Sequence, residues 1–142
     1  MNKLFVGAVV LIVLGIGFLA FSFNDDSNIT GNFASENSDD LKTFVLTGEN
    51  FKFVSSDGVD NPDIVVNKGD RVRIEFSSTS GFHDWVIDEF KSATKQVRDT
   101  DGKTFAEFVA SEAGEFEYYC SVGQHRANGM RGNLVVEWFL FF

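Results

Sequence analysis

The sequence predicts an all-β domain of the Greek-key β-sandwich type, and three observations lead to this prediction. Short runs rich in Val, Phe and Thr recur along residues 42–138, and several of them alternate apolar with polar residues. Groups of Gly, Asn and Asp that favour turns separate these runs, and no long amphipathic helix interrupts them. Seven or so short strands within about 100 residues are typical of a sandwich.

An apolar run precedes this domain. Residues 1–23 contain an uninterrupted apolar stretch that follows Lys3 and ends before two aspartates. A run of about 20 apolar residues matches the hydrocarbon thickness of a bilayer, and the lysine before it predicts an N-terminus inside and a domain on the extracytoplasmic side. Bulky Phe18, two places before Ala20, departs from the small-x-small cleavage pattern. We therefore expect a retained single-pass signal anchor; cleavage would instead release a secreted or periplasmic protein.

The next segment is predicted to be a flexible acidic linker. Residues 24–41 are rich in Asn, Ser and Asp and have almost no apolar periodicity, so they lack the surface needed to order a chain. The folded domain is then expected to occupy residues 42–142. The net charge of −9 argues against nucleic acid as a partner, because phosphates require Lys/Arg patches. It is compatible with attraction to a basic protein, and equally with plain solubility.

The first strands are predicted at residues 43–47, 51–54, 64–66 and 71–76, with turns between them. Alternation in the fourth of these places Val72, Ile74 and Phe76 toward the core.

The later strands are expected at residues 83–88, 104–110, 115–120 and 133–138, and a short helical turn is expected within 88–103. Alternation along 83–88 puts His83 on the same face as Trp85 and Ile87. In the same way Phe116, Tyr118 and Cys120 share one inward face. The apolar residues 139–142 are too few to span a membrane; they extend a strand, cover a sheet edge, or have no structural role.

The residues able to bind a soft metal are concentrated in two stretches. The chain has one Cys and two His, and its one Met besides the initiator is Met130. Cys120, His125 and Met130 are spaced Cys-x4-His-x4-Met, and His83 lies far upstream. Taken singly, a lone Cys, His or Met is more often structural than functional. Together a thiolate, two imidazoles and a thioether favour copper, whereas structural zinc requires four Cys or His ligands and only three are present.

The two stretches 82–88 and 118–132 resemble the ligand segments of the cupredoxins, the family of plastocyanin, azurin and rusticyanin. The resemblance covers about residues 42–138 and includes the turn at 67–72 and residues 113–116. It implies a cupredoxin-like sandwich that binds one copper ion. By position, the strong ligands would be His83, Cys120 and His125, and Met130 would be the weak axial ligand.

Three positions refine the resemblance. Four residues separate Cys120 from His125, as in azurin and rusticyanin, whereas plastocyanin-type loops have two. The family often has Asn after its first His ligand, and this chain has Asp84. Gln124 stands where the dinuclear copper centre of cytochrome oxidase subunit II has its second Cys, which implies one copper rather than two.

The resemblance implies a mononuclear type 1 (blue) copper protein that carries single electrons at the extracytoplasmic membrane face. Its expected partners are redox proteins such as cytochromes or membrane oxidase and reductase complexes. The alternative is a membrane-tethered copper carrier or scavenger without a redox role; a sandwich used only for protein binding is disfavoured because no ligand is missing. Enzymatic activity is not expected, because substrate-reducing copper needs further histidines.

Electrons are expected to pass through the edge of His125. In the family this is the ligand nearest the loop surface. A patch of small or apolar residues is expected to surround it, namely Gly81, Phe82, Gly123, Ala127, Gly129 and Met130.

Overall fold

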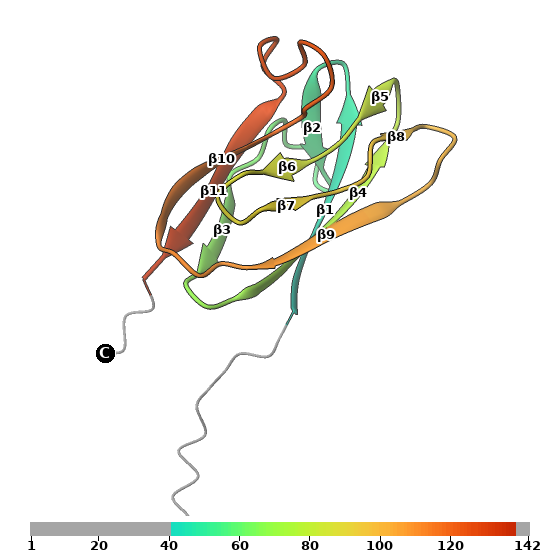
Figure 1. Ribbon diagram of the computed structural model, residues 1–142. Coiled ribbons are helices and arrows are strands. Elements are labelled where there is room, and N and C mark those ends of the chain that lie inside the picture. The colour runs from blue at the N-terminus through green and yellow to red at the C-terminus, as the bar shows by residue number, and fades with distance from the viewer. Residues whose placement is uncertain (1–40, 139–142) are drawn as a thin grey trace, which may run out of the picture. The chain divides into compact units, whose positions relative to one another are not determined.

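The computed structural model describes residues 41–138, which form eleven strands in two larger sheets and one two-stranded sheet (Figure 1). The predicted transmembrane helix (1–23), the linker up to residue 40 and the tail 139–142 lie outside the described residues. The first strand begins at Leu41, so the last residue assigned to the linker belongs to a sheet. Between 41 and 138 there is no helix, and therefore none that could cross a membrane.

The first sheet has the strand order β2-β1-β4-β9. β1 and β4 run parallel, whereas the other two pairs are antiparallel. A parallel pair cannot be joined by a tight hairpin, so the chain visits β3 of the second sheet before it returns as β4. The bounds are Leu41–Glu49 for β1, Lys52–Ser55 for β2, Arg71–Ser78 for β4 and Thr104–Val109 for β9.

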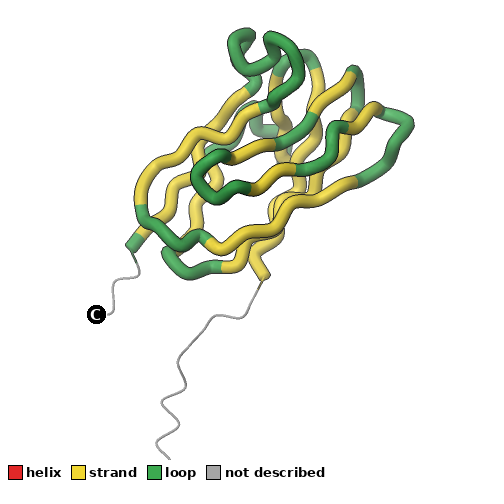
Figure 2. Tube along the Cα trace, in the orientation of Figure 1, coloured by secondary structure: helices red, strands yellow, loops and turns green. Residues whose placement is uncertain are grey.

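The second sheet has the order β3-β11-β10-β6-β7, and β5 pairs with β8 separately. Figure 2 shows that the loop between β10 and β11 lies at one end of the domain, opposite the end where β1 begins and β11 finishes. The bounds are Ile64–Asn67 for β3, Phe82–His83 for β5, Val86–Ile87 for β6, Ser92–Ala93 for β7, Val97–Arg98 for β8, Gly114–Tyr119 for β10 and Arg131–Glu137 for β11. The predicted all-β architecture is confirmed.

Two local predictions are wrong. The single strand expected at 83–88 is two short strands, β5 and β6, that pair with different neighbours. Between them the backbone N–H of Trp85 donates to Thr94 Oγ1 at 3.0 Å, and the N–H of Thr94 donates to the Trp85 carbonyl at 2.9 Å. The helical turn expected within 88–103 is absent, because this segment pairs with β6 and β5 as β7 and β8.

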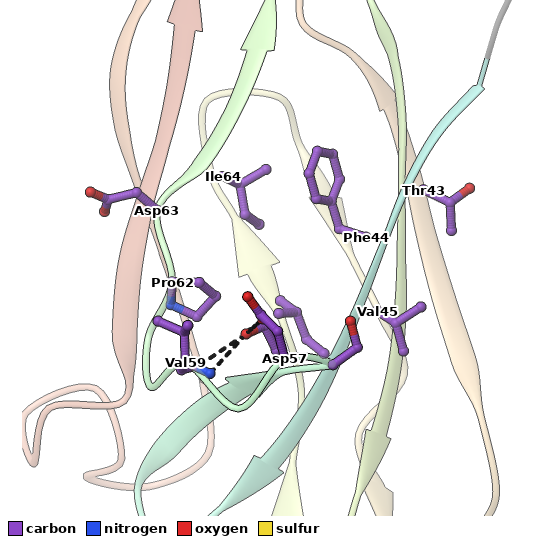
Figure 3. A pocket seen from close by; sticks show the side chains of 11 residues that line it. Thr43, Phe44, Val45, Asp57, Val59, Pro62, Asp63 and Ile64 are labelled. Atoms are coloured by element: carbon purple, nitrogen blue, oxygen red, sulfur yellow. Dashed lines mark hydrogen bonds between the residues drawn. The ribbon is translucent and has the colours of Figure 1, made fainter.

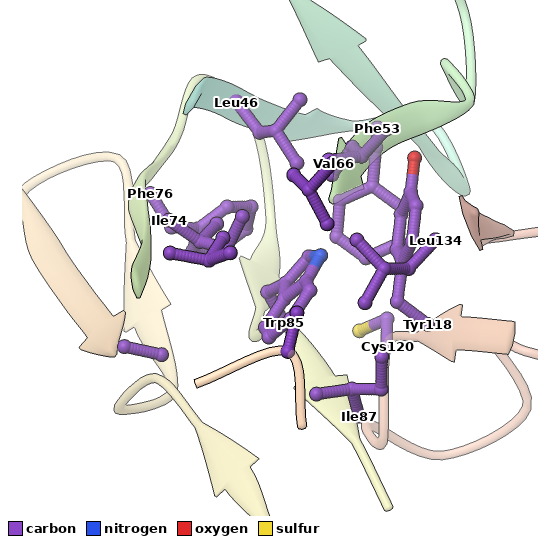
Figure 4. Packing of buried hydrophobic residues seen from close by; sticks show 14 of the residues in the cluster. Leu46, Phe53, Val66, Ile74, Phe76, Trp85, Ile87, Tyr118, Cys120 and Leu134 are labelled. Atoms are coloured by element: carbon purple, nitrogen blue, oxygen red, sulfur yellow. The ribbon is translucent and has the colours of Figure 1, made fainter. Parts of the chain in front are cut away.

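The core lies between the two sheets and contains the residues that alternation predicted. Val72, Ile74 and Phe76 are at most 1% exposed, as expected. Trp85 lies in the middle of the cluster (Figure 4) and stacks on Tyr118 with ring centroids 5.6 Å apart. The Tyr118 hydroxyl donates to the Pro62 carbonyl at 2.5 Å, so its polar end is satisfied. Burial of such large rings supplies much of the hydrophobic stabilisation of a small domain.

A glycine on β11 makes room for this tyrosine. Gly132 pairs with Tyr118 across the β10–β11 ladder. A Cβ atom on Gly132 would overlap the tyrosine hydroxyl and ring. The close approach of β11 therefore requires glycine here.

An open groove runs between β1 and the loop that joins β2 to β3 (Figure 3). Phe44 and Ile64 form part of its floor, and the Ser55 hydroxyl donates to Asp57 at its rim. None of the predicted metal ligands lines this groove, so it is separate from the site described below.

We expect Tyr118→Phe to lower the free energy of unfolding by about 1–2 kcal/mol, because it leaves the Pro62 carbonyl without its buried donor. Chemical denaturation of the metal-free protein measures this change. The matched control is Tyr119→Phe, whose hydroxyl donates to the exposed Asp88, and which should cost less than about 0.5 kcal/mol. Equal losses for the two variants would contradict the assignment.

Candidate metal centre

The structure brings three of the predicted ligands together. His83 ends β5, Cys120 follows β10 directly, and His125 lies in the loop before β11. The Nδ1 atoms of the two histidines are 3.1 Å apart, and the Cys120 Sγ lies 3.9 Å from that of His83 and 3.5 Å from that of His125. Their ligand atoms all lie within 4.8 Å of one another. Two segments 37 residues apart in the chain thus form one donor cluster.

The dimensions of this cluster match a metal ion. A point equidistant from the three atoms lies about 2 Å from each, given the three separations; zinc bonds to nitrogen and sulfur are about 2.0–2.3 Å long. Two imidazoles and one thiolate in a trigonal arrangement are the strong ligands of blue-copper sites. The residues present therefore fit a copper ion without rearrangement of the backbone.

His83 is held with the correct nitrogen facing the cluster. Its Nε2 lies 2.8 Å from the Ser80 carbonyl, so this nitrogen carries the proton and donates it. Nδ1 is consequently left with a free lone pair toward Cys120 and His125. Behind the ring, a Cβ on Gly48 would lie 2.9 Å from His83 Cβ and 2.8 Å from Phe76 Cζ. Glycine at this point of β1 lets the imidazole reach its place.

Backbone hydrogen bonds set the spacing of the other ligands. The Cys120 N–H donates to the Met130 carbonyl at 3.1 Å, and the Met130 N–H donates to the His125 carbonyl at 2.9 Å. Met130 is fully buried, as an axial ligand of a shielded ion must be. The two four-residue intervals of the Cys-x4-His-x4-Met motif thus close into a compact loop.

Cys120 and His125 differ in protonation and exposure. Cys120 is 1% exposed, and burial raises the pKa of its thiol to about 11. Burial, followed by the nearby His83, lowers the pKa of His125. In the metal-free protein at neutral pH the thiol is therefore protonated and the His125 imidazole is neutral, so metal binding must displace the thiol proton.

The surface around His125 differs in part from the predicted patch. His125 is partly exposed and shares an open hollow with Gly81 and Phe82, as expected. Met130 does not belong to this surface, because it is buried. Phe51, which the predicted patch does not include, packs edge-on against the His125 ring, and the two ring centroids are 5.0 Å apart. The sequence predicts Phe51 as the first residue of a strand, whereas it lies in the β1–β2 turn with a positive φ of 63°, so strand alternation could not place it beside His125.

A second group of residues that alternation did not identify forms a hydrogen-bond network next to the ligands. The Asp84 carboxylate accepts the backbone N–H of Ser121 at 2.7 Å and also the Ser121 hydroxyl. Gln96 Nε2 donates to Asp84 Oδ2 and to Ser121 Oγ, each at 3.3 Å. Asp84 follows His83 and Ser121 follows Cys120, so this network connects the two ligand segments. Gln96 could not be identified from the sequence, because the strand β8 (Val97–Arg98) that directly follows it was not predicted.

Gln124, the position that distinguishes one copper from two, is exposed and not among the clustered ligands. The described residues offer no other group of His, Cys, Asp and Glu that could hold a metal ion.

Known proteins with the same fold include blue copper proteins. No family model matches the chain, and no curated protein sequence matches it. Auracyanin A, a blue copper protein from Chloroflexus aurantiacus, superposes with a TM-score of 0.56 at 19% identity, over 69% of this chain and 100% of its own. Rusticyanin from Thiobacillus ferrooxidans superposes with a TM-score of 0.54 at 27% identity, over 68% of this chain and 77% of its own.

A larger protein also contains this fold. Fet3p, a multicopper oxidase that functions in iron import, superposes with a TM-score of 0.56 at 18% identity, over 69% of this chain but only 23% of its own length. The similarity to auracyanin A and Fet3p concerns the fold alone. With rusticyanin the chain shares more of its sequence, and the structural neighbours include cupredoxins. Residues 41–138 thus form a domain with the cupredoxin fold, and His83, Cys120, His125 and Met130 form a type 1 copper-like site for a single copper ion.

Proposed function

We propose that this chain is a mononuclear type 1 copper protein that carries single electrons between partner proteins at the extracytoplasmic face of a membrane. The observation that carries the proposal is the triangle formed by His83 Nδ1, His125 Nδ1 and Cys120 Sγ, whose size suits a metal ion. Bound copper would supply the one-electron Cu(I)/Cu(II) couple. The protein then has to hold the ligands still and give electrons a way out.

Ligand rigidity favours electron transfer over chemistry on a substrate. His83 is held by Ser80, and the loop ligands are held by the hydrogen bonds of Met130. Because these contacts are made by protein groups on both sides of the ligands, we propose that the protein rearranges little when the oxidation state changes. With two His and one Cys in the whole sequence, no imidazole is left for a second, substrate-reducing copper. We therefore propose a carrier and not an enzyme.

His125 is the proposed exit for electrons. It is the one strong ligand that is partly exposed, since Cys120 and His83 are buried. Phe51 and Phe82 flank the hollow that His125 lines. A small apolar surface of this kind suits short-lived redox complexes, which bury little area.

The proposed location depends on the N-terminal sequence. The apolar run within residues 1–23 would anchor the chain, and residues 24–40 would tether the domain with a reach of roughly 20–25 Å. Tethering raises the local concentration of the domain near membrane complexes. We propose cytochromes or membrane oxidase and reductase complexes as partners, and no nucleic acid.

Copper carriage is the second candidate function. The partial exposure of His125 favours copper carriage, because a ligand from an acceptor protein could reach the ion at this residue. The Cu(I)-loaded protein can be mixed with a Cu(I)-chelating acceptor and, separately, with the Cu(II)-loaded protein. Electron exchange much faster than copper loss supports the electron carrier, and the reverse order supports the copper carrier.

Addition of Cu(II) to the protein should produce the intense visible band and narrow copper hyperfine splitting of a thiolate-bound type 1 site. Cys120→Ser should abolish both, because it removes the thiolate that gives rise to them. Absorption and EPR spectroscopy make the test. Gln124→Ala is the control, since Gln124 lies in the same loop and is exposed. A colourless wild-type protein with bound Cu(II) would refute the type 1 assignment.

The metal-free protein should lose stability as pH rises from 9 to 11. The folded thiol of Cys120 has a pKa of about 11, above its ordinary value of 9.0, mainly because of burial. A raised folded pKa contributes stability that is complete below the ordinary value and disappears as pH passes through the folded value. Denaturant midpoints across this range measure it. Cys120→Ser has no thiol to ionise, so this part of the decline should be absent; identical profiles would show that Cys120 is not responsible.

Phe51→Asp should slow electron self-exchange between oxidised and reduced copies of the protein at least tenfold. The substitution puts a charge beside the His125 edge, where two copies must meet. NMR line broadening in mixtures of the two oxidation states gives the rate. The control is Phe105→Asp, a substitution of a similarly exposed phenylalanine (52% against 46%) on β9. Equal slowing in both variants would remove His125 as the exit.

A further inference from the structure

The groove between β1 and the β2–β3 loop contains an open strand edge (Figure 3). β4 pairs with β1 from Leu41 to Gly48, whereas β2 pairs only with the last part of β1, from Leu46 to Glu49. Within residues 41–138, no strand therefore lies on the other edge of residues 41–45. A strand edge of this kind presents unpaired N–H and C=O groups, to which a further strand can bond.

The side chains along this groove are largely apolar. Phe44 and Ile64 line it between the two strands (Figure 3), and both belong to or pack against the hydrophobic core. Val45 and Val59 also line the groove and remain 39% and 49% exposed. Its volume of about 580 Å³ lies in the range of known binding sites, which is roughly 300–1,000 Å³. The groove thus has room for several apolar side chains beside the free edge.

The wall opposite β1 is held in place by hydrogen bonds. Asn61 lies in the β2–β3 loop, and its N–H donates to the Phe53 carbonyl at 2.7 Å while its Oδ1 accepts the Phe53 N–H at 2.9 Å. The neighbouring Pro62 carbonyl accepts the Tyr118 hydroxyl. These bonds fix the loop to the core, so a segment that enters the groove meets a preformed surface. Preformed surfaces bind with a smaller loss of conformational entropy.

The charge at the border of the groove is negative. Asp57 and Asp63 are exposed, and the groups that donate to them, the Ser55 hydroxyl and the Asn133 amide, are neutral. Among residues 41–138, no Lys or Arg forms an ion pair with either carboxylate, and no Lys or Arg lines the groove. A basic segment would be attracted to this border. A second copy of the same groove would instead bring like charges together.

We propose that this groove binds an extended segment of a partner protein in which apolar and basic residues alternate, and which joins the sheet as an added strand beside β1. Successive side chains of a strand point to opposite faces. The apolar side chains of the segment would pack on Phe44 and Ile64, and its basic side chains would face solvent near Asp57 and Asp63. Addition of a strand to a free sheet edge is a common mode of peptide recognition.

The groove is separate from the proposed exit for electrons. It shares no lining residue with the hollow that His125 borders. A partner bound beside β1 would therefore leave the His125 edge free to meet a second protein. The groove can thus serve as an anchoring surface, and this inference holds whether or not the protein binds copper.

The test is a heteronuclear NMR titration of the metal-free full chain in a zwitterionic detergent with the peptide Lys-Val-Lys-Val-Lys-Val. We expect saturable shifts of the backbone amides of residues 43–46 and 57–64, and none at His125. The peptide Lys-Ser-Lys-Ser-Lys-Ser has the same charge without the apolar side chains, and it should bind about tenfold more weakly. The absence of shifts in the groove, or equal binding of the two peptides, would overturn the proposal.

The combined substitution Asp57→Asn and Asp63→Asn should weaken binding of the first peptide about fivefold, because exposed ion pairs are lost. Asp99→Asn is the matched control, since Asp99 is also exposed but lies outside the groove. Equal weakening by the control would assign the effect to net charge and overturn the proposal.

Two further results would assign the groove to another occupant and also overturn the proposal. One is binding of the peptide by a chain truncated after Trp138 but not by the full chain, which would show that residues 139–142 occupy the groove. The other is a dimer in sedimentation experiments that the peptide dissociates, which would show that a second copy does.

Discussion

The structure depends on one constraint: a nitrogen of His83 must lie within 4 Å of the Cys120 sulfur although 37 residues separate them. β6 pairs with β10 and thereby brings the chain after His83 alongside the chain before Cys120. Asp84 then closes the remaining distance through Ser121. Because these contacts are made between protein groups alone, the ligand cluster is a property of the folded chain.

The same arrangement explains why the hydrophobic core and the metal centre are continuous. Trp85 and Tyr118, the largest fully buried side chains, are each two residues from a ligand, and their rings stack between the sheets. A disturbance of this packing would displace the ligand segments as well, since cores are close-packed and transmit strain. Glycines at positions 48 and 132 permit the close approaches that such dense packing requires. Rigidity at the ligands is thus a consequence of core packing.

The segment after β10 carries two buried ligands and one partly exposed ligand. Cys120 and Met130 are out of contact with solvent, whereas His125 between them reaches the surface next to Phe51. Burial of the thiol raises its pKa, so the metal-free site holds a proton that a cation must replace. Shielded sulfur ligands and one accessible imidazole are what a carrier needs if electrons are to pass and water is to stay out.

The sequence alone determined the ligands, because four residues of rare types occur at a spacing that few other functions explain. It also determined the all-β class and the inward faces at Val72–Phe76 and Phe116–Cys120, since a period of two assigns faces directly. Only the tertiary structure decided which segments stand beside the ligands. The break between β5 and β6, the hydrogen bonds of Gln96 just before β8, and the contact of Phe51 with His125 all arise from long-range pairing. Such contacts depend on neighbours distant in the chain, and local periodicity contains no information about them.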